Sequence, residues 1–390
     1  MEPIVKFEDF LKTYPEKTQK RVMIYLRVME LRRKYGYGSK KIAKFLGISR
    51  NKIEGWLYGG NVPRPLKAIK FLEEIGLNLP LVASKKSTFI IFLKLLAFTF
   101  GDGGIASNFR PYFTGEEADL KILKKEIEDT FPCFRCKIIK IRSKDSKIGE
   151  RVISGTSFIL NIQGEGCYAF GRLLCAAGAP RGDKVIIPFL VPLWIMNGKK
   201  WVKKIFLNVL LGNELQAPKI DKTRSACFSS SRFVMVKTEE FLDIQMIFLN
   251  QIRKLLREFG IQTSKVKMEK PRKERKDGKN SYPMYFQIQK NRLNLYSFYK
   301  QFKLLYAQKK QRAFDDAVMI VRKSLVNELV KIRQYTEMQK LRRKGLGCRK
   351  VARYLGMPEK RSMIDGWMKR GQRPIYFNQR KKLEKILNTI

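Results

Sequence analysis

The 390-residue sequence contains no histidine. Imidazole is required by Ser/His/Asp and Cys/His nucleophile systems, by His-ligated zinc sites and by nucleases that use a histidine base. These classes are therefore excluded. Any chemistry at a phosphodiester would have to depend on carboxylates and a divalent metal ion, assisted by lysine.

Cysteines and long apolar segments are also scarce. Six cysteines in so long a chain form no dense disulfide framework, and the Cys133-x-x-Cys136 pair has no second pair with the spacing of a zinc site. The N-terminus lacks the basic-then-apolar pattern of a signal peptide. The apolar run at residues 89–100 contains Lys94 and is shorter than the roughly 18 residues of a membrane span. We therefore expect a reduced cytoplasmic protein without membrane segments.

Acidic residues are few, because 35 Asp and Glu stand against 81 Lys and Arg, a formal net charge of +46. Such an excess destabilises a compact fold by self-repulsion unless a polyanion binds to it. The basic residues are spread along the whole chain, which favours nucleic acid over an anionic membrane and predicts association with the nucleoid. The length of 390 residues allows two or three domains, and a hydrophobic content of 44% is enough to build their cores.

Two copies of one unit lie near the ends of the chain, at residues 31–65 and 341–374. In each copy a small residue, a glycine and two apolar anchors follow one another at the spacing of a helix-turn-helix unit. Ser39 is predicted to cap the first helix, and the second copy has two extra residues in its turn. The four positions are Ala43, Gly47, Ile53 and Trp56 in the first copy and Ala352, Gly356, Ile364 and Trp367 in the second.

Basic and amide residues on the second helix of each unit favour DNA binding over a plain helical hairpin, which is the commoner use of two packed helices. The two tryptophans are predicted to be core anchors, because each shares a helix face with an isoleucine. Basic segments at residues 143–151 and 271–280 are interpreted as hairpin tips that reach along a duplex backbone. The residues predicted to bind DNA are Arg50, Asn51, Lys52, Lys360, Arg361, Arg272, Lys273 and Arg275.

Between the end units, two stretches share the predicted order α-β-β-α-β-β-α. In the first stretch, helices are expected at residues 89–100, at 117–130 and up to 177, with a hairpin at 136–141 and 157–163. In the second, helices are expected at 198–211, at 239–260 and up to 306, with strands at 217–221, 224–233, 264–269 and 284–289.

The sequence LLAFTFGDG at residues 95–103, together with GAPRGDKVIIPFLVPLWI at 178–195, resembles the signature region of the LAGLIDADG homing endonucleases. A degenerate second copy, LNVLLGNEL, lies at residues 207–215. The resemblance covers residues 88–314 and implies an α+β fold, in which a pseudo-twofold pair of αββαββα halves acts as a monomer. The chain would comprise helix-turn-helix domains at 1–85 and 319–390 around halves at 86–190 and 191–318.

The resemblance implies that Asp102 and Glu214 share Mg²⁺ or Mn²⁺ and that the protein hydrolyses phosphodiesters of double-stranded DNA. Lysines that the family uses near the metal correspond to Lys184 and to Lys309 or Lys310, although a surface lysine explains each position equally well. Two alternatives stay open. One is a catalytically silent DNA-binding protein of the same origin, a transcription regulator or chromosome-architecture factor, and the other is an RNA-splicing cofactor.

Overall fold

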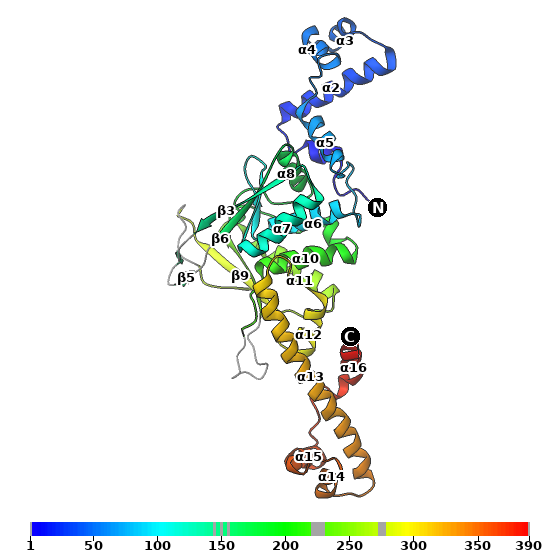
Figure 1. Cartoon of the computed structure of the whole chain (residues 1–390), viewed down its shortest axis with the longest axis vertical. Helices are drawn as coiled ribbons and strands as arrows, with labels where there is room; N and C mark the ends of the chain where they lie inside the picture. Colours follow the sequence, from blue (N-terminus) through cyan, green and yellow to red (C-terminus); the bar gives the residue numbers. More distant parts are fainter. Residues whose placement is uncertain are drawn as a thin grey trace.

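The computed structural model describes residues 2–142, 146–148, 151–153, 157–219, 231–271 and 278–388. The fold is α+β, with two small sheets on the same side of a helical layer and one helical unit at each end of the long axis (Figure 1). Among the described residues, no helix is both long and apolar enough to cross a membrane.

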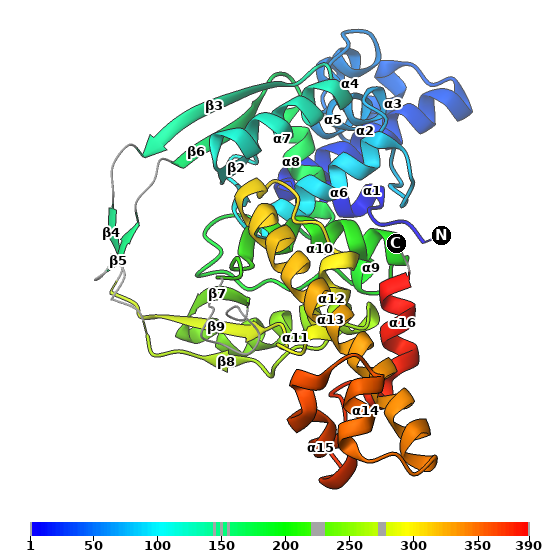
Figure 2. The same cartoon turned by 60° about the horizontal axis from the view of Figure 1, so that its bottom comes forward.

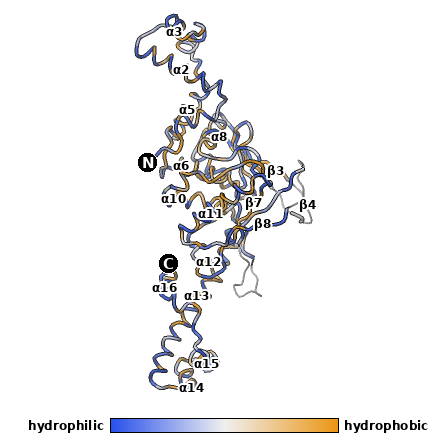
Figure 3. Tube along the Cα trace, turned by 180° about the vertical axis from the view of Figure 1, so that it is seen from behind, coloured by the Kyte–Doolittle hydropathy of each residue, from blue (hydrophilic) through white to orange (hydrophobic). Residues whose placement is uncertain are grey.

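Helices α6 (Ser87–Phe100) and α10 (Lys200–Glu214) pack side by side at the centre (Figure 2). From Phe89 onwards nearly all of α6 is buried, because Lys94 is its one charged side chain after the first turn. Hydrophobic residues are accordingly concentrated around these helices in Figure 3. Ala97 on α6 and the bulkier Val209 on α10 are both fully buried in this core.

The first sheet follows α6 and has the strand order β1-β2-β6-β3, with every neighbouring pair antiparallel. Helices α7 and α8 pack against it. A separate hairpin of two short strands, β4 and β5, lies between β3 and β6 in the sequence. The elements are β1 (Gly103–Ile105), β2 (Pro111–Gly115), α7 (Glu117–Thr130), β3 (Arg135–Arg142), β4 (Ser146–Ile148), β5 (Arg151–Ile153), β6 (Ser157–Gln163) and α8 (Cys167–Ala176).

The second sheet has the order β7-β9-β8 and follows α10. Much of the strand pair expected at 217–233 lies outside the described residues, and the described strand continues to Thr238 rather than ending at residue 233. A two-fold relation between the halves stays a prediction. The elements are α9 (Leu193–Met196), β7 (Arg232–Thr238), η1 (Glu239–Phe241), α11 (Leu242–Glu258), β8 (Lys267–Met268), β9 (Ser281–Gln287) and α12 (Arg292–Gln301).

Helices at both ends of the chain pack on the central core, which includes Leu72 of α5 and Leu383 of α16. Helix α13 runs without a break across the predicted domain boundary at residues 318 and 319. The end segments comprise α1 (Phe7–Leu11), α2 (Glu16–Tyr35), α3 (Ser39–Leu46), α4 (Arg50–Leu57), α5 (Arg64–Glu74), α13 (Gln308–Arg343), α14 (Cys348–Tyr354), η2 (Pro358–Lys360), α15 (Arg361–Lys369), η3 (Phe377–Gln379) and α16 (Arg380–Asn388).

Each helix-turn-helix unit has a small core of its own, closed by an edge-to-face aromatic pair. The ring centres of Tyr25 and Trp56 lie 5.7 Å apart in the first unit, and those of Tyr335 and Trp367 lie 5.5 Å apart in the second. The turn glycines, Gly47 and Gly356, have φ of 64° and 65°, which a side chain would strain. Both tryptophans are core anchors, as predicted.

The predicted role of Ser39 as an N-cap was wrong. Gly38 holds that position, and the hydroxyl of Ser39 donates instead to the carboxylate of Glu54 across the turn, at 3.1 Å. The side chain therefore ties α3 to α4. Cys348, at the equivalent position of the second unit, interacts in the same way with Asp365.

Candidate functional site

Four side chains converge where α6 and α10 end: Asp102, Lys184, Glu214 and Lys310, here called the four-residue centre. Glu214 is the last residue of α10, and Asp102 follows α6 by two residues. The helix ends approach closely because Gly101 lacks a side chain: a Cβ there would lie 2.6 Å from the Cβ of Asn213. This contact brings the two carboxylates into one site.

Each lysine of the centre binds the carbonyls at one helix end. Lys184, from the segment between α8 and α9, donates to the carbonyls of Gly101 and Gly103, the latter at 2.6 Å. Lys310, in the first turn of α13, donates to Gly212 at 2.8 Å and to Asn213 at 2.5 Å. Cations are favoured at helix C-termini, so the lysines stabilise both helix ends and offset the two carboxylates.

Burial shifts the pKa of every member of the centre toward its neutral form. It raises the pKa of Glu214 to about 8, and the nearby charge of Asp102 adds to that shift. Burial also raises the pKa of Asp102, although this residue keeps a solvent-exposed surface and both lysines oppose the shift. Burial lowers the pKa of Lys184 and of Lys310. Burial therefore favours the protonated form of Glu214 over a wider pH range than that of an exposed glutamate.

The chemistry of the donors fits a divalent cation with incomplete protein ligation. Among the residues that the structure describes, no group of three or more His, Cys, Asp and Glu forms a metal cage. Mg²⁺ commonly uses one or two carboxylates and completes its shell with water and phosphate oxygens. The Nδ2 of Asn213, buried against Gly101 beside the centre, has no hydrogen-bond partner in the described part of the chain.

The structure decides between the two lysines proposed at the start of α13. Lys309 does not enter the centre: its ammonium pairs with the carboxylate of Glu116 at 2.9 Å, and its side chain is 77% exposed. Neighbouring residues on a helix face different directions, so Lys310 points inward while Lys309 points to solvent. Lys184, Lys310, Asp102 and Glu214 are thus brought together, and Lys309 is not.

The residues predicted to bind DNA are dispersed. On α4, Arg50 forms an ion pair with Glu54 at 2.8 Å, whereas Asn51 and Lys52 are exposed. In the second unit Lys360 ends η2 and Arg361 begins α15, so only the latter lies on the second helix. The hairpin residues Arg272, Lys273 and Arg275 lie outside the described residues.

Sequence reasoning missed Lys237, a buried residue on β7 that supports the centre. Its ammonium donates to the carbonyls of Lys184 and Ile187 and lies 3.9 Å from the centre of the Phe189 ring. Burial lowers the pKa of Lys237 to about 8. The signal was present in the alternation of the strand, which places Lys237 on the same buried face as Phe233 and Met235.

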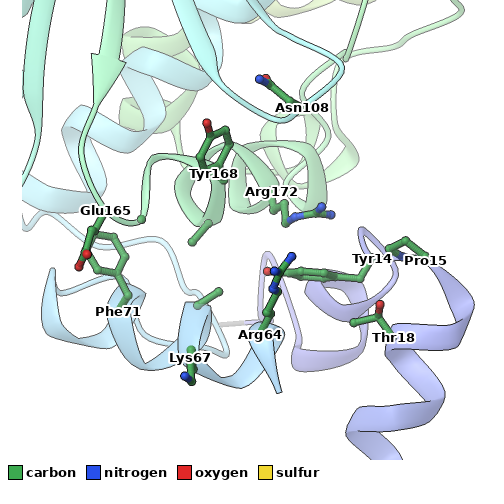
Figure 4. Close-up of a pocket in the computed structure, with 13 residues that line it drawn as sticks. Tyr14, Pro15, Thr18, Arg64, Lys67, Phe71, Asn108, Glu165, Tyr168 and Arg172 are labelled. Carbon is green, nitrogen blue, oxygen red and sulfur yellow. The ribbon is translucent and has the colours of Figure 1, made fainter. Parts of the chain in front are cut away.

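A basic cavity of about 640 Å³ lies between the N-terminal helices and α8 (Figure 4). The guanidinium of Arg172 lies 3.8 Å from the centre of the Tyr14 ring and 3.7 Å from that of Phe109, and it donates to the carbonyl of Thr13. Arg64 and Lys67 add two more cations to the lining. Arg172 thereby attaches the N-terminal segment to α8, so the structure gives it a packing role.

No family model matches the chain. The DNA-directed RNA polymerase subunit Rpo1N of Methanocaldococcus jannaschii is 30% identical over 48% of this chain and 14% of that protein. The tRNA-splicing ligase RtcB of Methanopyrus kandleri is 30% identical over 51% of this chain and 20% of its own length. The replication factor C small subunit of M. jannaschii is 29% identical over 65% of this chain and 14% of its own length. The chain spans a fifth or less of the length of these relatives.

The predicted family was wrong. These relatives are named as a polymerase subunit, a ligase and a replication factor, not as LAGLIDADG homing endonucleases, and no family model matches. The predicted endonuclease function is wrong for the same reason, and so is its alternative, a catalytically silent DNA-binding protein of that family. The description of the four-residue centre does not depend on that family, because it comes from the contacts of its four side chains.

Proposed function

We propose that this chain binds nucleic acid, specifically duplex DNA, and that the four-residue centre binds a divalent cation, Mg²⁺ in the cell, at a backbone phosphate. The observation that carries the proposal is the convergence of Asp102 and Glu214, from two helix ends, with Lys184 and Lys310. The names of the relatives, an RNA polymerase subunit, a tRNA-splicing ligase and a replication factor, support a nucleic-acid partner.

The faces of the two sheets that α7, α8 and α11 leave open offer a surface for this partner (Figure 2). On the first sheet, Asn161 stands between Tyr112 and Lys137 in one row across three strands. On the second, Tyr285 stands beside Lys267. Amide, basic and aromatic side chains in such rows suit contacts with phosphates, sugars and base edges. The net charge of +46 supplies long-range attraction.

Cation binding is tested with Mn²⁺ as the probe, because its paramagnetic resonance signal reports free ion directly. We expect the full chain to bind Mn²⁺ and Asp102→Asn to bind it at least about tenfold more weakly, since loss of even an outer-shell partner costs that much. Glu116→Gln is the matched control, because it removes an acidic residue that pairs with Lys309 outside the centre. Equal Mn²⁺ affinity in the wild type and Asp102→Asn would contradict the proposal.

Coupling between cation and DNA is tested by fluorescence anisotropy with a random-sequence duplex. Mg²⁺ should strengthen duplex binding by the wild type, because the cation neutralises carboxylates that otherwise face phosphate. In EDTA, Asp102→Asn should bind the duplex at least as tightly as the wild type, and Mg²⁺ should add little. If neither Mg²⁺ nor the Asp102→Asn substitution changes the duplex affinity, phosphate does not reach the centre.

A further inference from the structure

The first helices of the two end units, α3 and α14, present the same face to solvent. At four equivalent positions each helix carries three basic side chains and then one aromatic side chain, and all eight residues are exposed. The face consists of Lys40, Lys41, Lys44 and Phe45 on α3, and of Arg349, Lys350, Arg353 and Tyr354 on α14. We call these the α3 face and the α14 face.

Helical geometry gathers each set into one stripe. Positions separated by three or four residues are neighbours on a helix. Lys44 therefore lies beside Lys40 and Lys41, and Phe45 lies beside Lys41 at the edge of the stripe, and the equivalent positions of α14 have the same spacing. The opposite side of each helix packs inward, with Ile42 and Val351 fully buried in the unit cores. The faces are therefore set by the fold.

Within the described ranges, the basic residues of both faces have no acidic partner, although the ammonium of Lys41 lies 3.8 Å from the centre of the Tyr37 ring. Neither α3 nor α14 contains an acidic residue. In the part of the chain that the structure describes, none of the six basic side chains forms a salt bridge, whereas Arg50 on the neighbouring α4 pairs with Glu54. The first helices thus offer more uncompensated positive charge than the second helices, on which sequence reasoning placed DNA binding.

The aromatic rings are more exposed than packing requires. Phe45 is 61% exposed and Tyr354 is 68% exposed. A single exposed ring needs no explanation, and Tyr58 is such a case, because Lys369 stands at its position in the second unit. A ring at the same place in both units, each time at the edge of a stripe of three cations, forms a repeated surface rather than scattered exposure.

We propose that the α3 and α14 faces bind unpaired nucleic-acid strands. The cations contact backbone phosphates, and Phe45 or Tyr354 stacks on an unpaired base, as aromatic residues do in single-strand binding proteins. A paired base already stacks on its neighbours, so a blunt duplex gives these rings no base to stack on. The inference takes from the proposed function only the class of partner, and it uses a different surface.

The test measures binding of the full chain to labelled oligo-dT by fluorescence anisotropy in EDTA. We expect Phe45→Ala combined with Tyr354→Ala to weaken binding by about five- to a hundredfold, the range for losing one stacked base. Exchanging the rings, Phe45→Tyr with Tyr354→Phe, should retain affinity. Tyr58→Ala removes an equally exposed ring outside the faces, and it should leave affinity unchanged.

Three outcomes would overturn the inference: a wild type that does not bind oligo-dT, a double alanine variant with unchanged affinity, or an equal loss in Tyr58→Ala. Failure of the proposed function gives a different result. Asp102→Asn should leave oligo-dT binding in EDTA unchanged, and the double alanine variant should leave Mn²⁺ binding unchanged. A centre that binds no Mn²⁺, with oligo-dT binding that still depends on the rings, would refute the cation site and support this inference.

Discussion

Burial shifts the pKa of Glu214 toward a range in which ordinary side chains of this protein do not titrate. The chain has no histidine, so few unperturbed groups change charge between about pH 5 and 8. Burial raises the pKa of Glu214 from 4.5 to about 8, with a further contribution from Asp102. The folded chain therefore binds more protons than the unfolded chain, and Glu214 lowers the free energy of unfolding as pH rises from 4.5 through 8.

Glu214→Gln is predicted to flatten this dependence, because glutamine imitates the protonated side chain. In metal-free buffer the melting temperature of the wild type should fall between about pH 5 and 8, and that of the variant should fall less. Burial lowers the pKa of Lys237 from 10.5 to about 8. This residue therefore raises the free energy of unfolding as pH rises, but only above the range in which Glu214 acts. Scanning calorimetry at the two pH values measures the effect.

The control for this experiment is Glu116→Gln, which lies outside the centre and should keep the wild-type profile. An equal change in melting temperature between the two pH values in Glu214→Gln and in the wild type would contradict the prediction. It would mean that the Glu214 carboxyl is better solvated than the packing indicates.

Sequence reasoning named all four members of the centre but left open which of Lys309 and Lys310 belongs to it. The choice between Lys309 and Lys310 depends on where α13 begins, and a tertiary contact contributes to that start: the amide of Gln308 donates to the carboxylate of Asp119 at 2.9 Å. A short-range pattern cannot contain a contact between residues so far apart in sequence.

At the scale of elements, glycine shows why some boundaries were predicted and others were not. Gly47 ends α3 in a left-handed conformation, which its spacing in the repeat predicts. Gly212 suggests an end for α10 near residue 211, yet the helix continues to Glu214. A Cβ on Gly212 would lie 2.3 Å from the carbonyl oxygen of Leu305, so this glycine permits close packing rather than a turn.

Because each helix-turn-helix unit has its own core, we predict that Trp56→Ala unfolds the first unit alone. Truncating a buried aromatic residue costs about 3–5 kcal/mol, a large loss for a core of so few residues. Hydrogen exchange followed by mass spectrometry should show lost protection in α3 and α4, with α6 and α10 unchanged.

Trp367→Ala is the matched variant, because its ring closes the second unit in the same way. It should expose α14 and α15 and leave the first unit protected. Loss of protection throughout the molecule in either variant would show that the unit cores are coupled to the central core more strongly than their separation indicates.

At the scale of the whole molecule, one helix connects the centre with an end unit. Helix α13 carries Lys310 at its start and Tyr335, which packs on Trp367, near its other end. The central core extends along α13 to Ile332, so the C-terminal unit begins where that core ends. The predicted boundary at residue 319 lies inside this helix, which contributes residues to both cores.

The net charge of +46 sets the last prediction, which concerns the salt dependence of duplex binding. Each phosphate that the protein neutralises adds about 0.9 to the slope of log affinity against log salt, and a protein with six to ten contacts loses about 10³- to 10⁵-fold between 50 and 200 mM salt. We expect a loss of at least about a thousandfold, because cations lie on both sheets and on both end units.

Anisotropy titrations in EDTA measure the slope without the cation site. Circular dichroism at both salt concentrations checks that the fold is unchanged, and Tyr58→Ala, a neutral substitution, should keep the wild-type slope. A loss of less than about tenfold would mean that the positive charge is balanced by something other than a nucleic-acid backbone.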